Sequence, residues 1–174
     1  MNLWKSARLR TKKGVNCIVE IPKGSRKKYE LDIKTGKFVL SRTLDKKYTY
    51  PLNYGFIPGT LASDKDPLDV IILGKKLIKG SIVLCRIIAL LKMKDDHLTD
   101  DKILAIPLRE LSLQNIRDLN DVPSNILNDI KYFFKHYKER EVKKTKVFKW
   151  LPCSKAQSEI RLSTHRFERM KNVL

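Results

Sequence analysis

Residues 82–93 read IVLCRIIALLKM and form the longest strand-like run of the chain. Further runs rich in Val, Ile, Leu or Tyr lie on both sides of it, and such runs between turn-forming residues are typical of β-strands. They are Val15 to Ile21, Lys28 to Asp32, Lys37 to Ser41, Asp69 to Leu73 and Ile103 to Ile106. Lys34-Thr35-Gly36 between the second and third of the six runs indicates a hairpin. Many short strands in one compact chain predict a small barrel.

The last third of the chain changes to a helical period. Apolar residues after Pro123 recur at helical spacing, at Ile126, Leu127, Ile130, Phe133, Phe134 and Tyr137. This stripe predicts an amphipathic helix over residues 123–140, with Ser124 as its N-cap. A second helix is predicted over 154–172, with a weaker stripe at Ala156, Ile160, Phe167 and Met170. We expect both stripes to pack against the barrel rather than contact a ligand.

Length and composition restrict the class of protein. The 174 residues carry no internal repeat or linker, which favours a single domain over 1–174 with a basic N-terminal arm over 1–14. The first residues also have the composition of a transit peptide, but an arm that leads into the first strand is the favoured interpretation. No apolar run approaches the about 20 residues of a membrane helix. Cys17, Cys85 and Cys153 are isolated and odd in number, which indicates a reducing, cytoplasmic setting.

The charge is strongly unbalanced. Lys and Arg number 37 against 19 Asp and Glu, giving a net charge of +18 that favours contact with polyanions. The acids nevertheless gather in two clusters, Asp64, Asp66 and Asp69 followed by Asp95, Asp96, Asp100 and Asp101. Crowded carboxylates repel one another unless cations neutralise them, and hard cations such as Mg²⁺ take oxygen ligands. A solvated loop remains an alternative for the second cluster.

Other charged and phenolic residues stand in or beside predicted strands. Glu20 lies between two apolar residues of the first run, and the period of two places Lys28 and Glu30 on one face of the second. A water-facing side is the ordinary explanation for this alternation. The segment 50–55, YPLNYG, is expected to form a tight turn whose phenols either bind a phosphate oxygen or pack.

Several short motifs occur in one order along residues 15 to 140. They are Val19-Glu20-Ile21-Pro22, Lys28-Tyr29-Glu30, Arg42, the YPLNYG segment, the DxDPxD run from Asp64 to Asp69, Lys92-Met93 leading to Asp95, Asp100 and Lys102, Asn120-Asp121-Val122-Pro123 and Phe133-Phe134-Lys135-His136-Tyr137-Lys138. This order resembles the family I soluble inorganic pyrophosphatases in their bacterial-type short form. The DxDPxD run about ten residues after YPxNYG is the most specific part of the resemblance.

The resemblance implies a mainly β fold with flanking α, a five-stranded OB-like closed β-barrel with two packed helices. It implies an inorganic diphosphatase that hydrolyses pyrophosphate with several Mg²⁺ ions, for which Mn²⁺ could substitute, and a homohexamer. Metal positions match Asp64, Asp69, Asp100, Asp95, Glu20 and Glu30. The general base matches Asp66, with Tyr54 near the nucleophile, and phosphate-binding positions match Lys28, Arg42, Lys102, Tyr137 and Lys138. Metal ions would neutralise the substrate and make a bound water more acidic, while the cations would stabilise phosphoryl charge.

Some features depart from that family, and other functions remain open. Lys65 stands between two proposed metal ligands, the loop from Asp95 to Lys102 lacks a glycine, and Lys143 and Lys144 have no assigned role. A basic OB-type nucleic-acid-binding module is the main alternative, supported by eight basic residues against two acids over 131–149. Against it, spaced aspartates repel a phosphate backbone and no aromatic RNA-binding motif is present. A catalytically inactive scaffold is a third possibility. Nucleic acid is therefore not a required partner, although weak polyanion binding is compatible with the charge.

Overall fold

The computed structural model describes residues 13–139 and 144–172, together with Trp4, Leu9, Thr11 and Glu141. Most of the expected basic arm over 1–14, and Lys143, lie outside the described residues. The strands are β1 (Val15–Ile21), β2 (Lys27–Asp32), β3 (Lys37–Thr43), β4 (Asn53–Phe56), β5 (Asp69–Ile72), β6 (Ile82–Asp95), β7 (Leu98–Thr99), β8 (Lys102–Pro107) and β9 (Thr145–Pro152). The helices are α2 (Ser124–His136) and α3 (Cys153–Lys171), with short 3-10 helices η1 (Leu111–Leu113) and η2 (Leu119–Asp121). The chain is mainly β with two long helices, as expected.

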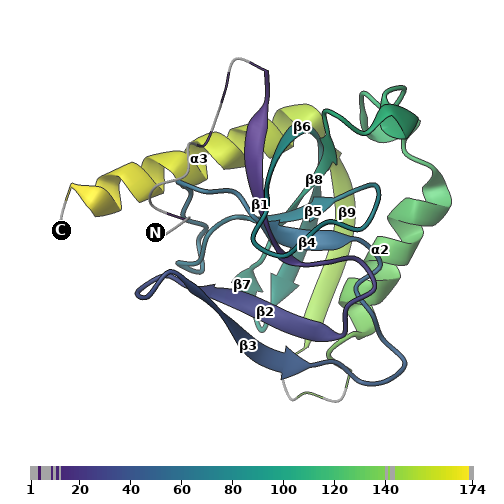
Figure 1. Cartoon of the computed structure of the whole chain (residues 1–174), viewed down its shortest axis with the longest axis horizontal. Helices are drawn as coiled ribbons and strands as arrows, with labels where there is room; N and C mark the ends of the chain where they lie inside the picture. The colour runs from purple at the N-terminus through teal and green to yellow at the C-terminus, as the bar shows by residue number, and fades with distance from the viewer. Residues whose placement is uncertain are drawn as a thin grey trace.

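Seven strands form one sheet in the order β1-β4-β5-β8-β6-β7, with β9 added along β6 (Figure 1). The β6 strand also pairs with β1, so the pairings of β1, β4, β5, β8 and β6 return to their starting point. The β5–β8 pair is parallel, and the other pairs are antiparallel. The β2–β3 hairpin forms a separate two-stranded sheet across the predicted turn, where Gly36 has a φ of 71°.

The apolar run over residues 82–93 lies in β6, which pairs with four other strands of the sheet. β6 has 14 residues and is long enough to pair with β1 and β8 in its first part and with β7 and β9 further on. Residues 87–91 of β6 are buried, because strands or helices cover both of its faces there. Continuous apolar sequence in this stretch therefore reflects burial on two sides.

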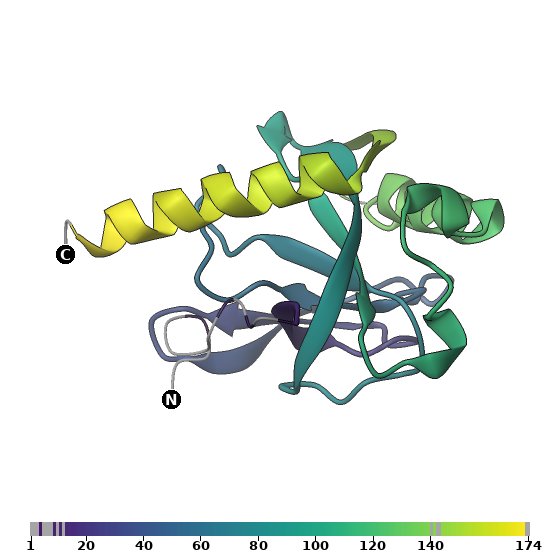
Figure 2. The same ribbon diagram turned by 90° about the horizontal axis from the view of Figure 1, so that it is seen from above.

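The two helices pack through the predicted stripes and lie on different sides of the strands (Figure 2). Ile130, Phe133 and Phe134 of α2 are buried in the core, and α3 buries Ala156, Ile160 and Phe167. The structure corrects both helix starts. Pro123 and Pro152 hold the N-cap positions, and neither supplies a side-chain cap. Ser124 was wrongly expected as a cap, because the proline before it already has the non-helical backbone, with ψ of 132°, that precedes the first turn.

The YPLNYG segment is only partly the turn that was expected, because Asn53 to Gly55 lie in β4. A Cβ atom on Gly55 would stand 1.8 Å from the Ile18 carbonyl oxygen, so glycine lets β1 and β4 approach. The rings of Tyr50 and Tyr54 pack against Phe133 and Phe134 of α2, with centroids 4.9 and 5.9 Å apart. Both phenols therefore anchor the helix to the sheet.

Among the described residues, neither helix combines the length and hydrophobicity that a membrane crossing requires. The three cysteines are free, with Cys17 and Cys85 buried.

Candidate active site

A cavity of about 460 Å³ opens between the β2–β3 hairpin and the β6–β7 turn, and residues from distant parts of the chain line it. Twelve of the thirteen predicted site residues are among them: Glu20, Lys28, Glu30, Tyr54, Asp64, Asp66, Asp69, Asp95, Asp100, Lys102, Tyr137 and Lys138. Asp96 also lines the cavity and had been noted only as part of an acidic cluster. The structure thus brings carboxylates from both acidic clusters and three of the four predicted cations to one place.

The first acidic cluster is held by a turn at the entrance to β5. The Asp66 N–H donates to Asp64 Oδ1 at 3.1 Å, and the Ala62 N–H donates to the Asp66 carbonyl at 2.7 Å. Lys65 between them has a φ of 75°, and its side chain is exposed and does not line the cavity. The Lys65 side chain is thus exposed outside the cavity, although its position in the sequence lies between two proposed metal ligands.

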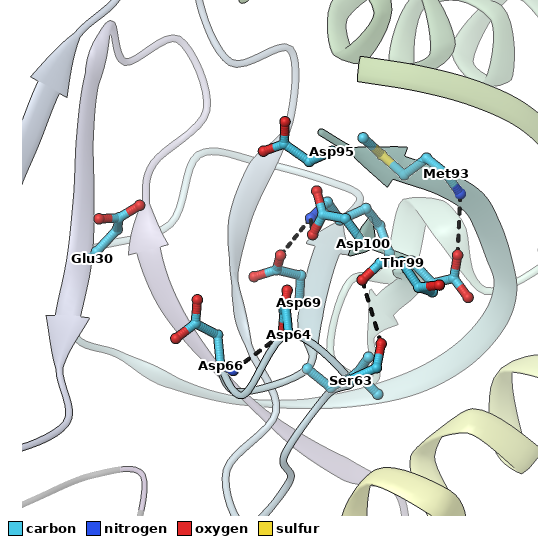
Figure 3. A network of polar contacts seen from close by, with 12 residues as sticks. Glu30, Ser63, Asp64, Asp66, Asp69, Met93, Asp95, Thr99 and Asp100 are labelled. Carbon is cyan, nitrogen blue, oxygen red and sulfur yellow. Dashed lines mark hydrogen bonds and ion pairs between the residues drawn. The ribbon is translucent and has the colours of Figure 1, made fainter. Parts of the chain in front are cut away.

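The second cluster lies on the β6–β7 hairpin. Asp95 pairs with Leu98, which leaves Asp96 and His97 as a two-residue turn. Both have positive φ, 45° and 73°, as in a type I′ turn. Two non-glycine residues thus make the turn in the loop that lacks a glycine. Asp95 lies on one side of the turn and Asp100 follows β7 on the other, and both face the space near Asp64 and Asp69 (Figure 3).

Lys102 connects the two clusters. Its Nζ donates to the carboxylates of Asp69 and Asp100, and its side chain is 2% exposed. Burial alone would lower the pKa of this ammonium, but the two carboxylates outweigh burial and raise it above its usual range. Lys102 therefore stays protonated and partly neutralises the acids around it.

The carboxylates repel one another in spite of Lys102. Burial first and the charge of Asp69 second raise the pKa of Glu20 from 4.5 to about 8. Burial likewise raises the pKa of Asp100 to about 6, with Lys102 opposing it. The pKa values of Asp64 and Asp66 are also raised by burial and by neighbouring acids. The carboxylates that line the cavity therefore outnumber the three lysines that could neutralise them.

The carboxylate oxygens of the site suit hard divalent metal ions, which prefer oxygen ligands. Asp95 Oδ1 is a buried oxygen without a hydrogen-bond partner among the described residues, while its other oxygen accepts from Lys138 Nζ. Within those residues, no three acidic, histidine or cysteine side chains are already grouped to hold one ion. Lys102 lies between Asp69 and Asp100, so ion binding there requires the lysine and the carboxylates to rearrange.

The lysine and tyrosine side chains that line the cavity supply hydrogen-bond donors. Lys28 forms an ion pair with Glu30. Burial would raise the pKa of the Glu30 carboxyl, but the charge of Lys28 opposes burial, and the pKa is lowered overall. Burial lowers the pKa of Lys138, against the influence of Asp95. Burial raises the pKa values of Tyr54 and Tyr137, so both phenols keep their protons and can donate hydrogen bonds.

Arg42 is the predicted site residue that does not line the main cavity. It lies in an adjoining cavity of about 290 Å³ that shares Tyr137 and Lys138 with the main one. The guanidinium pairs with Glu141 and lies 5.4 Å from the centre of the Tyr137 ring. No pattern in the sequence indicated Glu141 as a residue of the site, because its partner Arg42 lies 99 residues away.

Comparisons of the sequence and the fold with known proteins point to a single family. A family model described as inorganic pyrophosphatase matches residues 17–168. An inorganic pyrophosphatase of Sulfolobus acidocaldarius is 44% identical over 156 residues, which cover 87% of this chain and 90% of that protein. A soluble inorganic pyrophosphatase of rice, Oryza sativa subsp. indica, is 41% identical over 149 residues, 85% of this chain and 70% of that protein. The crystal structure of the inorganic pyrophosphatase from Thermus thermophilus superposes with a TM-score of 0.92 at 36% identity, covering 97% of this chain and 99% of that one.

The fold, the cavity and these matches define a class, the phosphoric anhydride hydrolases that act as inorganic diphosphatases. Within that class, the chain belongs to the inorganic pyrophosphatase family and to its family I. The resemblance that the motifs carried is thereby confirmed. A nucleic-acid-binding module as the primary role is not favoured.

Proposed function

We propose that the chain hydrolyses pyrophosphate to two phosphates in a Mg²⁺-dependent reaction within the main cavity. The observation that carries this is the meeting of carboxylates from both acidic clusters with Lys28, Lys102 and Lys138 in one space. When bound, divalent ions supply charge neutralisation and a more acidic water. Mn²⁺ is a possible substitute, because it accepts the same oxygen ligands.

Asp64, Asp69, Asp100 and Asp95 would hold the ions, with Glu20 and Glu30 nearby. Support comes from their shared cavity, the mutual repulsion of these acids and the unpartnered oxygen of Asp95. A bound cation relieves this repulsion, which is why binding is favoured.

Asp66 would act as the general base and Tyr54 would orient the nucleophile with its phenol. The raised pKa of Asp66 supports this role, because a more basic carboxylate accepts a proton more readily at neutral pH. Lys28, Lys102, Tyr137 and Lys138 would donate to phosphate oxygens and stabilise their charge as the bond breaks. Arg42 would join them by leaving Glu141.

Other parts of the proposal concern the molecule as a whole. The cycle of five paired strands would be a closed barrel of the OB type, the chain would assemble as a homohexamer, and it would work in the cytoplasm. The net charge of +18 supports a weak secondary affinity for polyanions. Salt-dependent retention of RNA by the purified chain tests that affinity, and light scattering tests the oligomer.

A phosphate-release assay with pyrophosphate, run with Mg²⁺ and then with a chelator, tests the central proposal. We expect phosphate release with Mg²⁺ and its loss with the chelator. Asp66→Asn should reduce turnover by about 10²- to 10⁴-fold without changing the fold, because the amide cannot accept the proton. Near-normal turnover in Asp66→Asn would refute the assigned base.

A further inference from the structure

Asp101 is a buried acid to which the proposed reaction gives no role. Its side chain is 3% exposed, and it does not line the main cavity, although Asp100 and Lys102 on either side of it do. Successive residues of an extended chain point to opposite faces, so Asp101 points away from the cavity. A buried carboxylate is costly unless it is paired and hydrogen-bonded, which makes its partners informative.

Two groups of β6 bind the Asp101 carboxylate. The Met93 N–H donates to Oδ1 at 3.1 Å, and Lys92 Nζ donates to Oδ2 at 2.7 Å. A dashed line from the Met93 nitrogen marks this hydrogen bond in Figure 3. Lys92 is 41% exposed, so its ion pair is partly screened by water, whereas the Met93 contact is buried.

The Met93 contact lies where the strand ladder is interrupted. β6 pairs with β8 up to Leu91 and with β7 from Lys94 onward. In between, the Asp100 N–H donates to the Met93 carbonyl at 3.1 Å, but the Met93 N–H goes to the Asp101 side chain. A carboxylate thus takes the place of a backbone carbonyl in the ladder. Both backbone groups of Met93 are bound across the gap.

We propose that Asp101 is a positioning residue that fixes the relative placement of Asp95 and Asp100 for ion binding. Asp95 lies two residues beyond Met93, and Asp100 precedes Asp101, so the Met93 contact sets the distance between the two branches of the hairpin. This inference rests on the proposed function, because it gives Asp101 its purpose through the ions that Asp95 and Asp100 would hold. Groups that orient metal ligands in this way commonly change metal affinity by about 10- to 100-fold when removed.

Calorimetric titration of the ion-free chain with MgCl₂ tests the proposal in three variants and one control variant. Asp101→Ala should raise the Mg²⁺ dissociation constant by about 10- to 100-fold. Asp101→Asn keeps an oxygen for the Met93 N–H and should stay close to the wild type, and Lys92→Met should change little. Asp121→Ala is the control, because Asp121 likewise accepts backbone hydrogen bonds, from the N–H groups of Arg117 and Asp118, but does not line the cavity. It should lower stability and leave Mg²⁺ affinity unchanged.

Hydrogen exchange of the wild type gives a readout that does not depend on the variants folding. The Met93 amide should be protected to the same degree as the neighbouring ladder amides, and rapid exchange at Met93 would overturn the proposal. Wild-type affinity in a folded Asp101→Ala, or equal loss in Asp101→Ala and Asp121→Ala, would also overturn it while leaving the proposed function intact. Absence of Mg²⁺ binding in the wild type would instead refute the proposed function and this inference with it.

Discussion

Glu20 shows how burial at one residue links the site to stability. With a chelator present, the folded chain should hold a proton on Glu20 between pH values of about 4.5 and 8, where the unfolded chain has lost it. The free energy of unfolding should therefore fall as pH rises through this window, by roughly 1 kcal/mol per pH unit. Glu20→Gln keeps an acceptor for the Leu31 N–H, which now donates to Oε1 at 2.8 Å, and removes the titration.

Urea denaturation of the wild type and of Glu20→Gln across this pH range measures the effect. The variant should gain stability relative to the wild type as pH rises, because only the unfolded wild type is stabilised by releasing a proton from residue 20. A constant difference between the two chains at every pH would contradict the assignment of this titration to Glu20.

Arg42 and Glu141 make a second prediction at the residue scale. Arg42 does not line the main cavity, so it must leave Glu141 before it can bind a phosphate there. The pair is partly exposed and should be worth about 1 kcal/mol or less. Glu141→Gln should therefore lower the KM for pyrophosphate by up to about fivefold, measured by initial rates at saturating Mg²⁺.

A double-mutant cycle provides the control for that prediction. Arg42→Ala should raise KM, and Glu141→Gln added to Arg42→Ala should have no further effect. A higher KM in Glu141→Gln alone would mean that the pair holds Arg42 ready for the substrate instead of competing with it.

At the scale of elements, the β6–β7 turn carries strain that a substitution can relieve. His97 has a φ of 73°, which costs a non-glycine residue about 1 kcal/mol and which glycine adopts freely. His97→Gly should raise the melting temperature by roughly 2 to 4 °C for a chain of this size, measured by calorimetry. His97→Ala keeps the strain and is the matched control. An equal gain in both variants would assign the effect to loss of the imidazole.

The strands also show what could be predicted from the sequence. Val15–Ile21 was predicted with its observed bounds, because apolar runs report burial directly. β4 was missed because Asn53 and Gly55 look like turn residues. In the fold, the Asn53 side chain is fully buried and accepts from the N–H groups of Lys23 and Leu77, at 3.0 and 2.8 Å. β9 was missed because it alternates between half-buried and exposed residues and is rich in lysine.

The site, like the strands, could be predicted in part from local patterns in the sequence. The types of residue at the site could be read from motifs, because chemistry restricts which side chains serve near phosphate and metal ions. The position of Lys102 between Asp69 and Asp100, and the pairing of Arg42 with Glu141, depend on contacts between segments far apart in sequence. No local pattern encodes those contacts, so they required the folded chain.

At the scale of the molecule, ion binding and global stability should be coupled. The proposed ligands come from the loop before β5 and its first residue, from β6 and from the residues between β7 and β8. An ion held by ligands from separate segments binds the folded chain and not the unfolded one. Mg²⁺ at about 100 times its dissociation constant should add about 2.7 kcal/mol to the free energy of unfolding. For 174 residues, the melting temperature should rise by roughly 5 to 10 °C.

The net charge of +18 makes the choice of control important. Any salt screens the repulsion among these cations and should stabilise the fold to some degree. KCl at matched ionic strength measures that contribution, and only the excess with MgCl₂ reports site binding. Asp69→Asn should abolish the excess and leave the KCl effect in place, because it removes one proposed ligand and changes the net charge by a single unit. Equal melting temperatures in the two salts for the wild type would show that magnesium acts on this molecule by screening alone.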